Sequence, residues 1–230
     1  MGDKVNINIS IGYAKSHILY ENINLMVELG GIHNIVGENG TGKSTFYKTL
    51  IGVIPPIEGE VPKAFSKNMA IVSDYVSLPG ELFVKDIVDF IGNEKLEYMK
   101  LKYRTVWEII HSLKDQSIKT LSTGQKRMLE IFTILSTNKT ILILDEACNG
   151  LDYRNKSYFI QNIKKLSSEH GVTIFNTSHN LEDVVDFGGY VYLMDKNAKK
   201  IRAYEGEMTI EKLNLYMKSI YGDVQDETIV

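Results

Sequence analysis

Apolar residues alternate with polar ones in two stretches near the N-terminus. From Val5 to Ile11, and again from Ile23 to Leu29, every second residue is isoleucine, leucine or valine. A period of two puts those side chains on one face of an extended chain. The pattern therefore predicts two antiparallel strands, each with one face buried and the other toward solvent.

Short apolar runs follow farther along the chain, and helical patterns lie between several of them. The runs are Ile32 to Val36, Met69 to Val72, Ile141 to Leu144, Val172 to Phe175 and Tyr190 to Met194. The main helical patterns are Lys43 to Val53, Gly124 to Thr137 and Tyr153 to Ser168. Short runs of this kind are typical of strands in the middle of a sheet. Their alternation with helices predicts the α/β fold class, with a mostly parallel sheet covered by helices.

The segment from Asp74 to Thr120 departs from this rhythm, because it contains no clear strand. Helical patterns occur around Lys85 to Ile91 and Arg104 to Leu113. We expect a small helical lobe inserted into the α/β core. From Glu207 to Val230 the pattern predicts one more amphipathic helix, followed by an acidic end.

Composition narrows the possible classes of protein. The chain has 230 residues and a net charge of −3, so its overall charge indicates no nucleic-acid partner. Cys148 is the single cysteine, which excludes an intrachain disulfide and is compatible with a cytosolic setting. The stretch from Met1 to Ser10 lacks the apolar region of a signal peptide. No segment approaches the roughly 20 apolar residues of a membrane span, so we expect any membrane role to require a partner.

A glycine-rich segment after the third predicted strand matches the phosphate-binding pattern G-x-x-x-x-G-K-[ST]. Its glycines allow the backbone to wrap closely around phosphate oxygens, and the following helix directs its positive dipole end toward them. Lys43 is expected to reach the β- and γ-phosphates, and the Ser44 hydroxyl to ligate Mg²⁺. The predicted nucleotide-binding residues here are Gly37, Glu38, Asn39, Gly40, Thr41, Gly42, Lys43, Ser44 and Thr45.

Two carboxylates follow the apolar run from Ile141 to Leu144. Asp145 and Glu146 are expected at the carboxyl edge of the sheet, where ligands of open α/β sheets bind. Asp145 is a candidate Mg²⁺ ligand, and Glu146 is a candidate general base toward the attacking water. An Asp-Glu pair at a strand end is weak evidence for a catalytic role by itself. Here the pair follows a phosphate-binding loop in the sequence, and the evidence becomes strong.

Further motifs carry a resemblance to a known family. Leu121-Ser-Thr-Gly-Gln125 is similar to the signature motif of the ATP-binding cassette (ABC) family. Asn149 to Asp152 resembles that family's D-loop, and His179 resembles its switch histidine. Tyr13 matches the aromatic residue that stacks on adenine, although an ordinary strand tyrosine is the alternative. These motifs occur in the family's order, and the resemblance extends to about Glu205.

The resemblance implies one ABC ATPase domain. A P-loop NTPase core of RecA-like type would occupy residues 1–73 and 121–205 and include the antiparallel part. A helical subdomain would occupy residues 74–120, and a C-terminal helix and tail residues 206–230.

The resemblance also implies roles for individual residues. Glu146, His179 and Lys43 would be catalytic, with His179 contacting the γ-phosphate or the water. The anion site at the start of the signature helix would close over the ATP held by a second subunit. That site consists of Ser122, Thr123, Gly124 and Gln125.

Three positions depart from the family's pattern. Asp74 stands where the family has a glutamine, and we count it with Ser44 and Asp145 as a metal ligand because its oxygens are hard donors. Thr123 replaces a glycine, which matters most if its backbone needs a positive φ. Ala147 and Cys148 replace a Pro-Thr pair.

The function that this resemblance implies is ATP binding and hydrolysis in an ABC transporter. Two cassettes would dimerise around two ATP molecules and drive membrane permease subunits, contacted through the lobe at 74–120. The compact chain suggests an ABC-2-like exporter, peripheral on the cytoplasmic face of the membrane. Two alternatives stay open: a soluble ABC ATPase or scaffold outside transport, and a degenerate ATP-binding half of a heterodimer.

Overall fold

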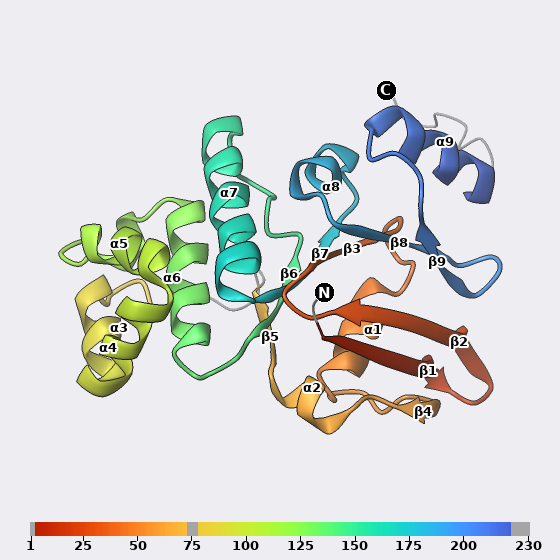
Figure 1. The fold of residues 1–230 in the computed structure, drawn as a ribbon, viewed down its shortest axis with the longest axis horizontal. Helices are drawn as coiled ribbons and strands as arrows, with labels where there is room; N and C mark the ends of the chain where they lie inside the picture. Colours follow the sequence, from red (N-terminus) through yellow and green to blue (C-terminus); the bar gives the residue numbers. More distant parts are fainter. Residues whose placement is uncertain (1–2, 73–77, 222–230) are drawn as a thin grey trace.

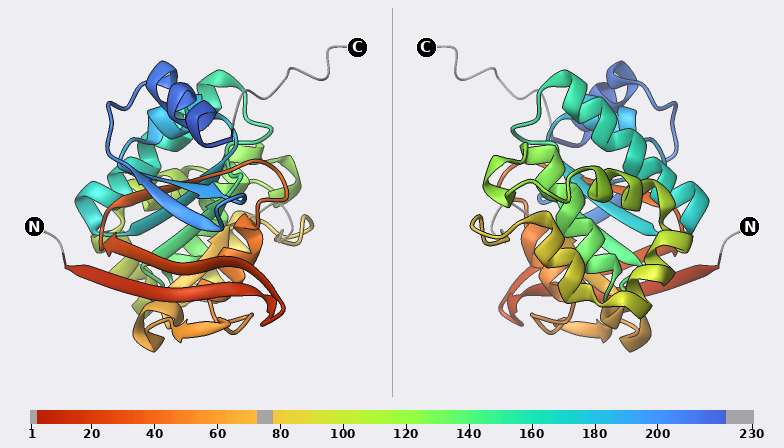
Figure 2. Two further views of the ribbon diagram at one scale, coloured as in Figure 1. Left: turned by 90° about the vertical axis from the view of Figure 1, so that its right-hand side faces the viewer. Right: turned by 90° about the vertical axis from the view of Figure 1, so that its left-hand side faces the viewer.

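The structure is a computed structural model, and it describes residues 3–72 and 78–221. Figure 1 shows two sheets on one side of the molecule and a group of helices on the other. The antiparallel sheet forms a layer of its own beside the main sheet, and the left view of Figure 2 also shows this separation.

The smaller sheet is antiparallel and has the strand order β2-β1-β4. Strand β1 (Lys4–Ala14) pairs with β2 (His17–Glu28), so that Ile7 lies opposite Leu25 and Ile9 opposite Ile23. The residues that alternate in the sequence are buried on one face of this hairpin. This confirms the antiparallel prediction, while the short third strand, β4 (Glu58–Glu60), was not predicted.

Within the described residues, the main sheet has six strands in the order β5-β6-β7-β3-β8-β9. Five of them run parallel, and only β9 pairs antiparallel to its neighbour. The strands are β3 (Ile32–Val36), β5 (Met69–Val72), β6 (Ile141–Asp145), β7 (Thr173–Ser178), β8 (Tyr190–Asp195) and β9 (Lys200–Tyr204). The predicted α/β class with a mostly parallel sheet is therefore confirmed, and β9 is the strand that the sequence patterns missed.

The two faces of the main sheet pack against different partners. Ile141 and Ile143 of β6 lie in a core shared with the antiparallel sheet and helix α1 (Lys43–Leu50). Their neighbours Leu142 and Leu144 point to the other face and pack with α6 (Thr123–Leu135) and α7 (Tyr153–His170). Alternate burial on both faces explains why this strand is a continuous apolar run.

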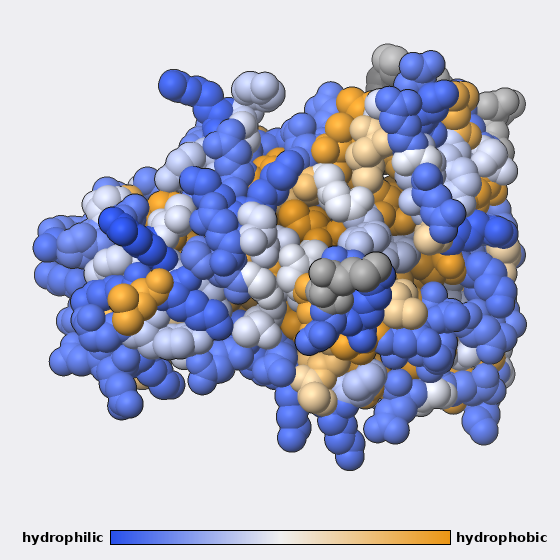
Figure 3. Space-filling model, in the orientation of Figure 1, coloured by the Kyte–Doolittle hydropathy of each residue, from blue (hydrophilic) through white to orange (hydrophobic). Residues whose placement is uncertain are grey.

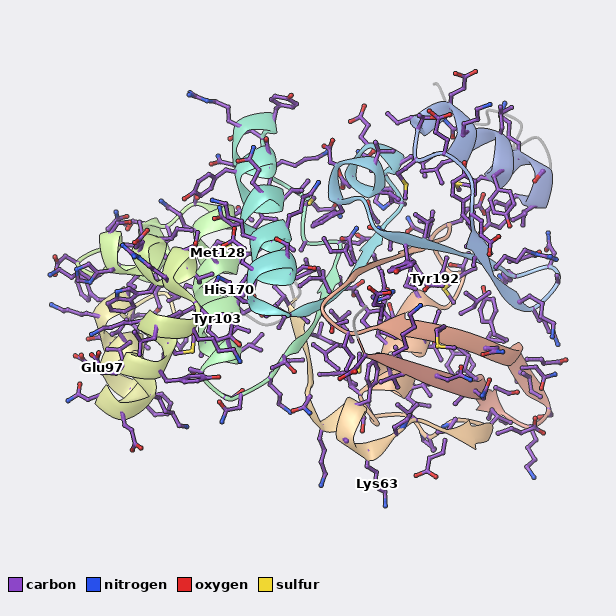
Figure 4. The ribbon with its side chains drawn as sticks, viewed as in Figure 1. Lys63, Glu97, Tyr103, Met128, His170 and Tyr192 are labelled. Atoms are coloured by element: carbon purple, nitrogen blue, oxygen red, sulfur yellow. The ribbon has the colours of Figure 1, made fainter. Side chains whose placement is uncertain are left out.

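Residues 84–112 form three helices that pack beside α6. They are α3 (Val84–Ile91), α4 (Asn93–Lys102) and α5 (Arg104–Ser112). The sequence predicted the first and the third, but not α4, whose buried residues are only Leu96 and Met99. Buried Tyr103 at the end of α4 contacts the His170 ring of α7 edge-on, with 5.6 Å between ring centroids (Figure 4).

Smaller elements complete the fold. They are α2 (Lys63–Lys67), the 3₁₀ turn η1 (Ile118–Thr120), α8 (Leu181–Phe187) and α9 (Ile210–Tyr221). Helix α9 lies within the segment where one C-terminal helix was expected. No helix in the described ranges combines the length and the apolar character needed to cross a bilayer. Most of the surface visible in Figure 3 is hydrophilic, with apolar residues gathered mainly near the middle of that face.

Parallel register brings three strand ends together at one edge of the main sheet. Asp145 at the end of β6 lies beside Thr177 of β7. Val36 at the end of β3 lies beside Ser178. Since β7 is between β6 and β3, the loops that follow all three strands start next to one another. Glu146 follows β6, the phosphate-binding loop follows β3, and His179 follows β7.

Burial of a histidine gives this fold a pH dependence that can be measured. His33 is fully buried among the rings of Phe175, Tyr190 and Tyr192, and the burial lowers its pKa. Below about pH 6.5 the unfolded chain therefore binds a proton that the folded chain resists, and the free energy of unfolding falls by up to about 1.4 kcal/mol per pH unit. Urea denaturation at about pH 7.5 and about pH 5.5 measures this loss.

The matched control is His33→Phe, which keeps an aromatic ring but cannot titrate. The other four histidines are present in both proteins, so their contribution cancels in the comparison. We expect the loss between the two pH values to be smaller in the variant. An equal loss in both proteins would contradict the assignment to His33.

Candidate active site

An open cavity of about 740 Å³ lies at the edge where the three strand ends meet. The residues lining it come from the β1–β2 hairpin, the phosphate-binding loop, helix α1, the end of β6 and the turn after β8. They are Tyr13, His17, Leu19, Asn39, Gly40, Gly42, Lys43, Ser44, Thr45, Asp145, Glu146 and Lys196. Nine of the sequence-predicted site residues are thus brought together, from segments up to 133 positions apart in the chain.

Glycines shape the loop that precedes α1. Gly40 and Gly42 have φ values of 76° and 98°, in the left-handed region that favours glycine. A Cβ on Gly37 would lie 2.7 Å from the Thr41 hydroxyl, too close for any other residue without a shift. Thr41 itself donates to the carbonyl of Glu38 at 2.8 Å. Gly37, Glu38 and Thr41 therefore build the loop, although they do not line the cavity.

Tyr20 supports this loop from the neighbouring sheet, and no sequence pattern indicated this role. Its buried hydroxyl donates to the Thr41 carbonyl at 2.7 Å. Burial raises the pKa of Tyr20 well above its usual value, so the hydroxyl stays protonated and remains a donor. A residue of the antiparallel sheet thus helps to hold the phosphate-binding loop in position at the cavity.

Lys43 is folded back against its own loop. Its ammonium group donates to the carbonyls of Gly37 at 2.7 Å and Glu38 at 2.9 Å. Burial lowers the Lys43 pKa, while the carboxylates of Glu146, Asp145 and Glu38 act to raise it. The Lys43 ammonium is therefore a buried donor enclosed by the backbone of its own loop. A bound phosphate could replace the two carbonyls as the acceptor of its hydrogen bonds.

Ser44 and Asp145 supply the oxygen atoms suited to a magnesium ion. Asp145 accepts a hydrogen bond from the Thr177 hydroxyl at 2.8 Å, which orients its carboxylate toward the cavity that Ser44 also lines. Among the described residues no cluster of three or more His, Cys, Asp or Glu side chains could hold a metal alone. Two hard oxygen ligands next to a phosphate site fit Mg²⁺, which usually takes few protein ligands and completes its shell with phosphates and water.

Glu146 follows Asp145 in a conformation that is uncommon for a glutamate, with φ 52°. Its backbone N–H donates to the Thr177 hydroxyl at 3.0 Å. The carboxylate meets two partners: the Nδ1 atom of His179 lies 3.4 Å from Oε1, and the Asn149 amide donates to Oε2 at 2.8 Å. His179 therefore lies beside Glu146, although it does not line the cavity itself.

The mouth of the cavity carries aromatic and basic side chains. The Tyr13 ring is 66% exposed, and its hydroxyl lies 3.1 Å from that of Thr45. The His17 ring is 5.6 Å from the Tyr13 ring, and Lys196 reaches the cavity from the turn between β8 and β9. The sequence patterns indicated neither His17 nor Lys196, because neither belongs to a recognisable motif.

The signature residues 122–125 lie at the start of α6 and do not line this cavity. The Ser122 hydroxyl accepts from the Gln125 N–H at 3.3 Å, and the Gln125 side chain accepts from the Ser122 N–H at 2.9 Å. This capping box leaves first-turn N–H groups, including those of Thr123 and Gly124, without an acceptor inside the helix. Thr123 begins helix α6 and does not have a positive φ. A threonine at this position, where the family has glycine, therefore causes no backbone strain.

One predicted metal ligand is not described. Asp74 lies outside the described residues, and its expected role as a ligand stays a prediction from the sequence. Ala147 and Cys148, which replace the expected Pro-Thr pair, are both buried. Burial raises the pKa of the Cys148 thiol to about 12, so the thiol is uncharged near neutral pH.

Comparisons with known proteins agree with this geometry. The sequence model of a family described as "ABC transporter" matches residues 20–149. A zinc import ATP-binding protein of Aliivibrio fischeri is 29% identical over 204 residues, covering 88% of this chain and 79% of its own. A putative ABC transporter ATP-binding protein of Methanosarcina acetivorans is 30% identical over 238 residues, covering 92% and 86%.

A solved structure has the same fold. It is a nucleotide-free ATP-binding cassette from an ABC transporter, with a TM-score of 0.74 at 20% identity, covering 96% of this chain and 98% of that one. Of the two relatives above, the zinc import protein is the one whose description states a direction of transport, and that direction is import. These relatives give no support to the ABC-2 exporter type expected from the compact chain.

The exposed ring of Tyr13 leads to a test of nucleotide binding. We expect Tyr13→Ala to weaken ATP binding by about tenfold or more, because stacking of a base on an aromatic ring is worth roughly 1–3 kcal/mol. Tyr13→Phe keeps the ring and loses only the contact with Thr45, so its affinity should stay close to that of the original protein. Isothermal titration with ATP measures both, and unchanged affinity in Tyr13→Ala would identify Tyr13 as an ordinary strand residue.

Proposed function

The chain belongs to the ABC transporter family, and from this membership we propose that it is the ATP-hydrolysing subunit of an importer, working as one of two cassettes. It is an ABC ATPase, in which ATP binding and hydrolysis are coupled to transport. The observation that carries the detailed proposal is the convergence of Lys43, Asp145 and Glu146 on one cavity at the carboxyl edge of the sheet.

In the proposed binding mode, the triphosphate lies over the loop at residues 37–44 with the adenine against Tyr13. The Lys43 ammonium leaves the carbonyls of Gly37 and Glu38 for the β- and γ-phosphates. This exchange places a buried positive charge against the phosphates in a site where water screens it poorly. Mg²⁺ held by Ser44 and Asp145 would neutralise charge that develops on the phosphate oxygens.

Hydrolysis in this proposal uses Glu146 as the general base. Glu146 takes a proton from the attacking water while the water oxygen bonds to the γ-phosphorus. The bond between the γ-phosphorus and the bridging oxygen breaks, and ADP and phosphate result. His179 is close enough to Glu146 to orient the water or the γ-phosphate oxygens from the other side.

A second copy or a homologous cassette would complete the site. The N-terminus of α6 exposes Ser122 and Thr123, but these residues do not line the cavity of their own chain. In a dimer, this anion site of one subunit would contact the phosphates of the ATP bound at the phosphate loop of the other. The two ATP molecules would then lie between the two chains, and their hydrolysis would separate the subunits.

Membrane subunits are the other partners that we propose. No helix among the described residues could span the bilayer. In this proposal the transport path belongs to permease subunits, to which this chain attaches peripherally. We propose that the segment at 74–120, with helices α3 to α5, forms the attachment surface. Import is proposed in place of the export that the chain length suggested, with the zinc import relative in support.

Replacement of the proposed base separates hydrolysis from binding. Glu146→Gln is expected to lower the rate of phosphate release by about a hundredfold or more, because the amide cannot accept the proton. ATP binding, measured with a fluorescent ATP analogue, should change little. Lys43→Met is the counterpart, and it should weaken binding of the analogue because the buried phosphate contact is lost. Phosphate release from Glu146→Gln at the original rate would refute the assignment.

A further inference from the structure

The backbone around Glu146 is held in place by groups from other parts of the fold. Its N–H is fixed on Thr177 of β7, and its φ of 52° turns the chain sharply out of the sheet. The side chain is 34% exposed, so packing alone does not select one rotamer. A carboxylate in such a position needs hydrogen bonds if its oxygens are to point in a defined direction.

The loop that follows Glu146 is anchored to α6 by Arg127. This side chain is buried, and its guanidinium donates to the carbonyls of Ala147 and Asn149, the latter at 3.0 Å. The Asn149 N–H in turn donates to the Glu146 carbonyl at 3.0 Å. The backbone of Asn149 is therefore fixed at both its N–H and its carbonyl, and its short side chain starts from a defined point.

From that point the Asn149 amide donates to Oε2 of Glu146 at 2.8 Å. We infer that Asn149 is a positioning residue for ATP hydrolysis, which holds Oε2 of Glu146 so that the other oxygen, Oε1, serves the attacking water. This inference rests on the proposed role of Glu146 as the base. Oε1 is the atom next to His179, the side chain that we propose contacts the γ-phosphate or the attacking water.

An amide is the group that this position requires. It donates a hydrogen bond without adding charge beside Asp145, Glu146 and the phosphates. An aspartate of the same size would present only acceptors to the carboxylate and repel it. An alanine would leave the carboxylate free to rotate. Because Asn149 is exposed, neither substitution removes a buried contact, and the fold should tolerate both.

The test measures steady-state hydrolysis by the full chain. Asn149→Ala is expected to lower kcat by about tenfold, the usual scale of a hydrogen bond to a charged group, with the KM for ATP changed by less than about twofold. Asn149→Asp should lower kcat further, to about a hundredth. A residue with a merely structural role would not rank the isosteric aspartate below alanine.

Asn155 provides the matched control. Its amide donates to the carboxylate of Asp152 at 2.6 Å, again across three residues, but away from Glu146. Asn155→Ala should keep the original kcat. A kcat for Asn149→Ala within about twofold of the original, or an Asn149→Asp variant as active as Asn149→Ala, would overturn the inference. Glu146→Gln with full turnover would instead overturn the proposed function.

A spectroscopic measurement tests the contact without turnover or metal. In the protein labelled with ¹⁵N at asparagine, the side-chain amide signals of Asn149 and Asn155 can be assigned from the two alanine variants. We expect Glu146→Gln to shift the Asn149 signal, because its acceptor loses the charge, and to leave the Asn155 signal in place. An unchanged Asn149 signal would refute the hydrogen bond, whatever the rates are.

Discussion

The parallel register of β6, β7 and β3 is the constraint on which the rest of the molecule depends. Because Asp145 pairs with Thr177 and Val36 with Ser178, the three strands end level with one another. Neighbouring strands are about 4.8 Å apart, so three loops begin within one small area. The phosphate loop, the two carboxylates and His179 owe their proximity to this alignment.

Side chains from distant elements then hold those loops in shape. Tyr20 of the antiparallel sheet holds Thr41, Thr177 of β7 orients Asp145 and fixes the Glu146 backbone, and Arg127 of α6 holds the loop after it. Each is a hydrogen bond between parts of the chain that are far apart in sequence. The geometry of the site therefore depends on how these elements pack, since the hydrogen bonds that hold the loops come from distant parts of the fold.

The signature helix begins apart from the cavity, and this separation is the basis for the proposed pairing of two cassettes. Ser122 caps α6 through a reciprocal pair of hydrogen bonds with Gln125, and neither residue lines the cavity at the chain's own phosphate loop. The Leu151 side chain lies 3.5 Å from where a Gly124 Cβ would be, so the D-loop and the signature helix are in contact. Together with Arg127, this contact connects the helix start to the loop that carries Glu146.

The sequence by itself determined the features that depend on local order along the chain. Period-two alternation predicted β1 and β2, apolar runs predicted β3, β5, β6, β7 and β8, and the glycine-rich loop and Asp145-Glu146 identified the chemistry. Tertiary structure alone decided that His17 and Lys196 line the cavity. It also decided that Tyr20 supports the phosphate loop and that Asn149 contacts the Glu146 carboxylate. The physical reason is that a strand or a phosphate loop has a periodic or compositional pattern of its own. A contact such as that of Tyr20 with Thr41 arises only when two sheets pack, and it leaves no pattern in either segment.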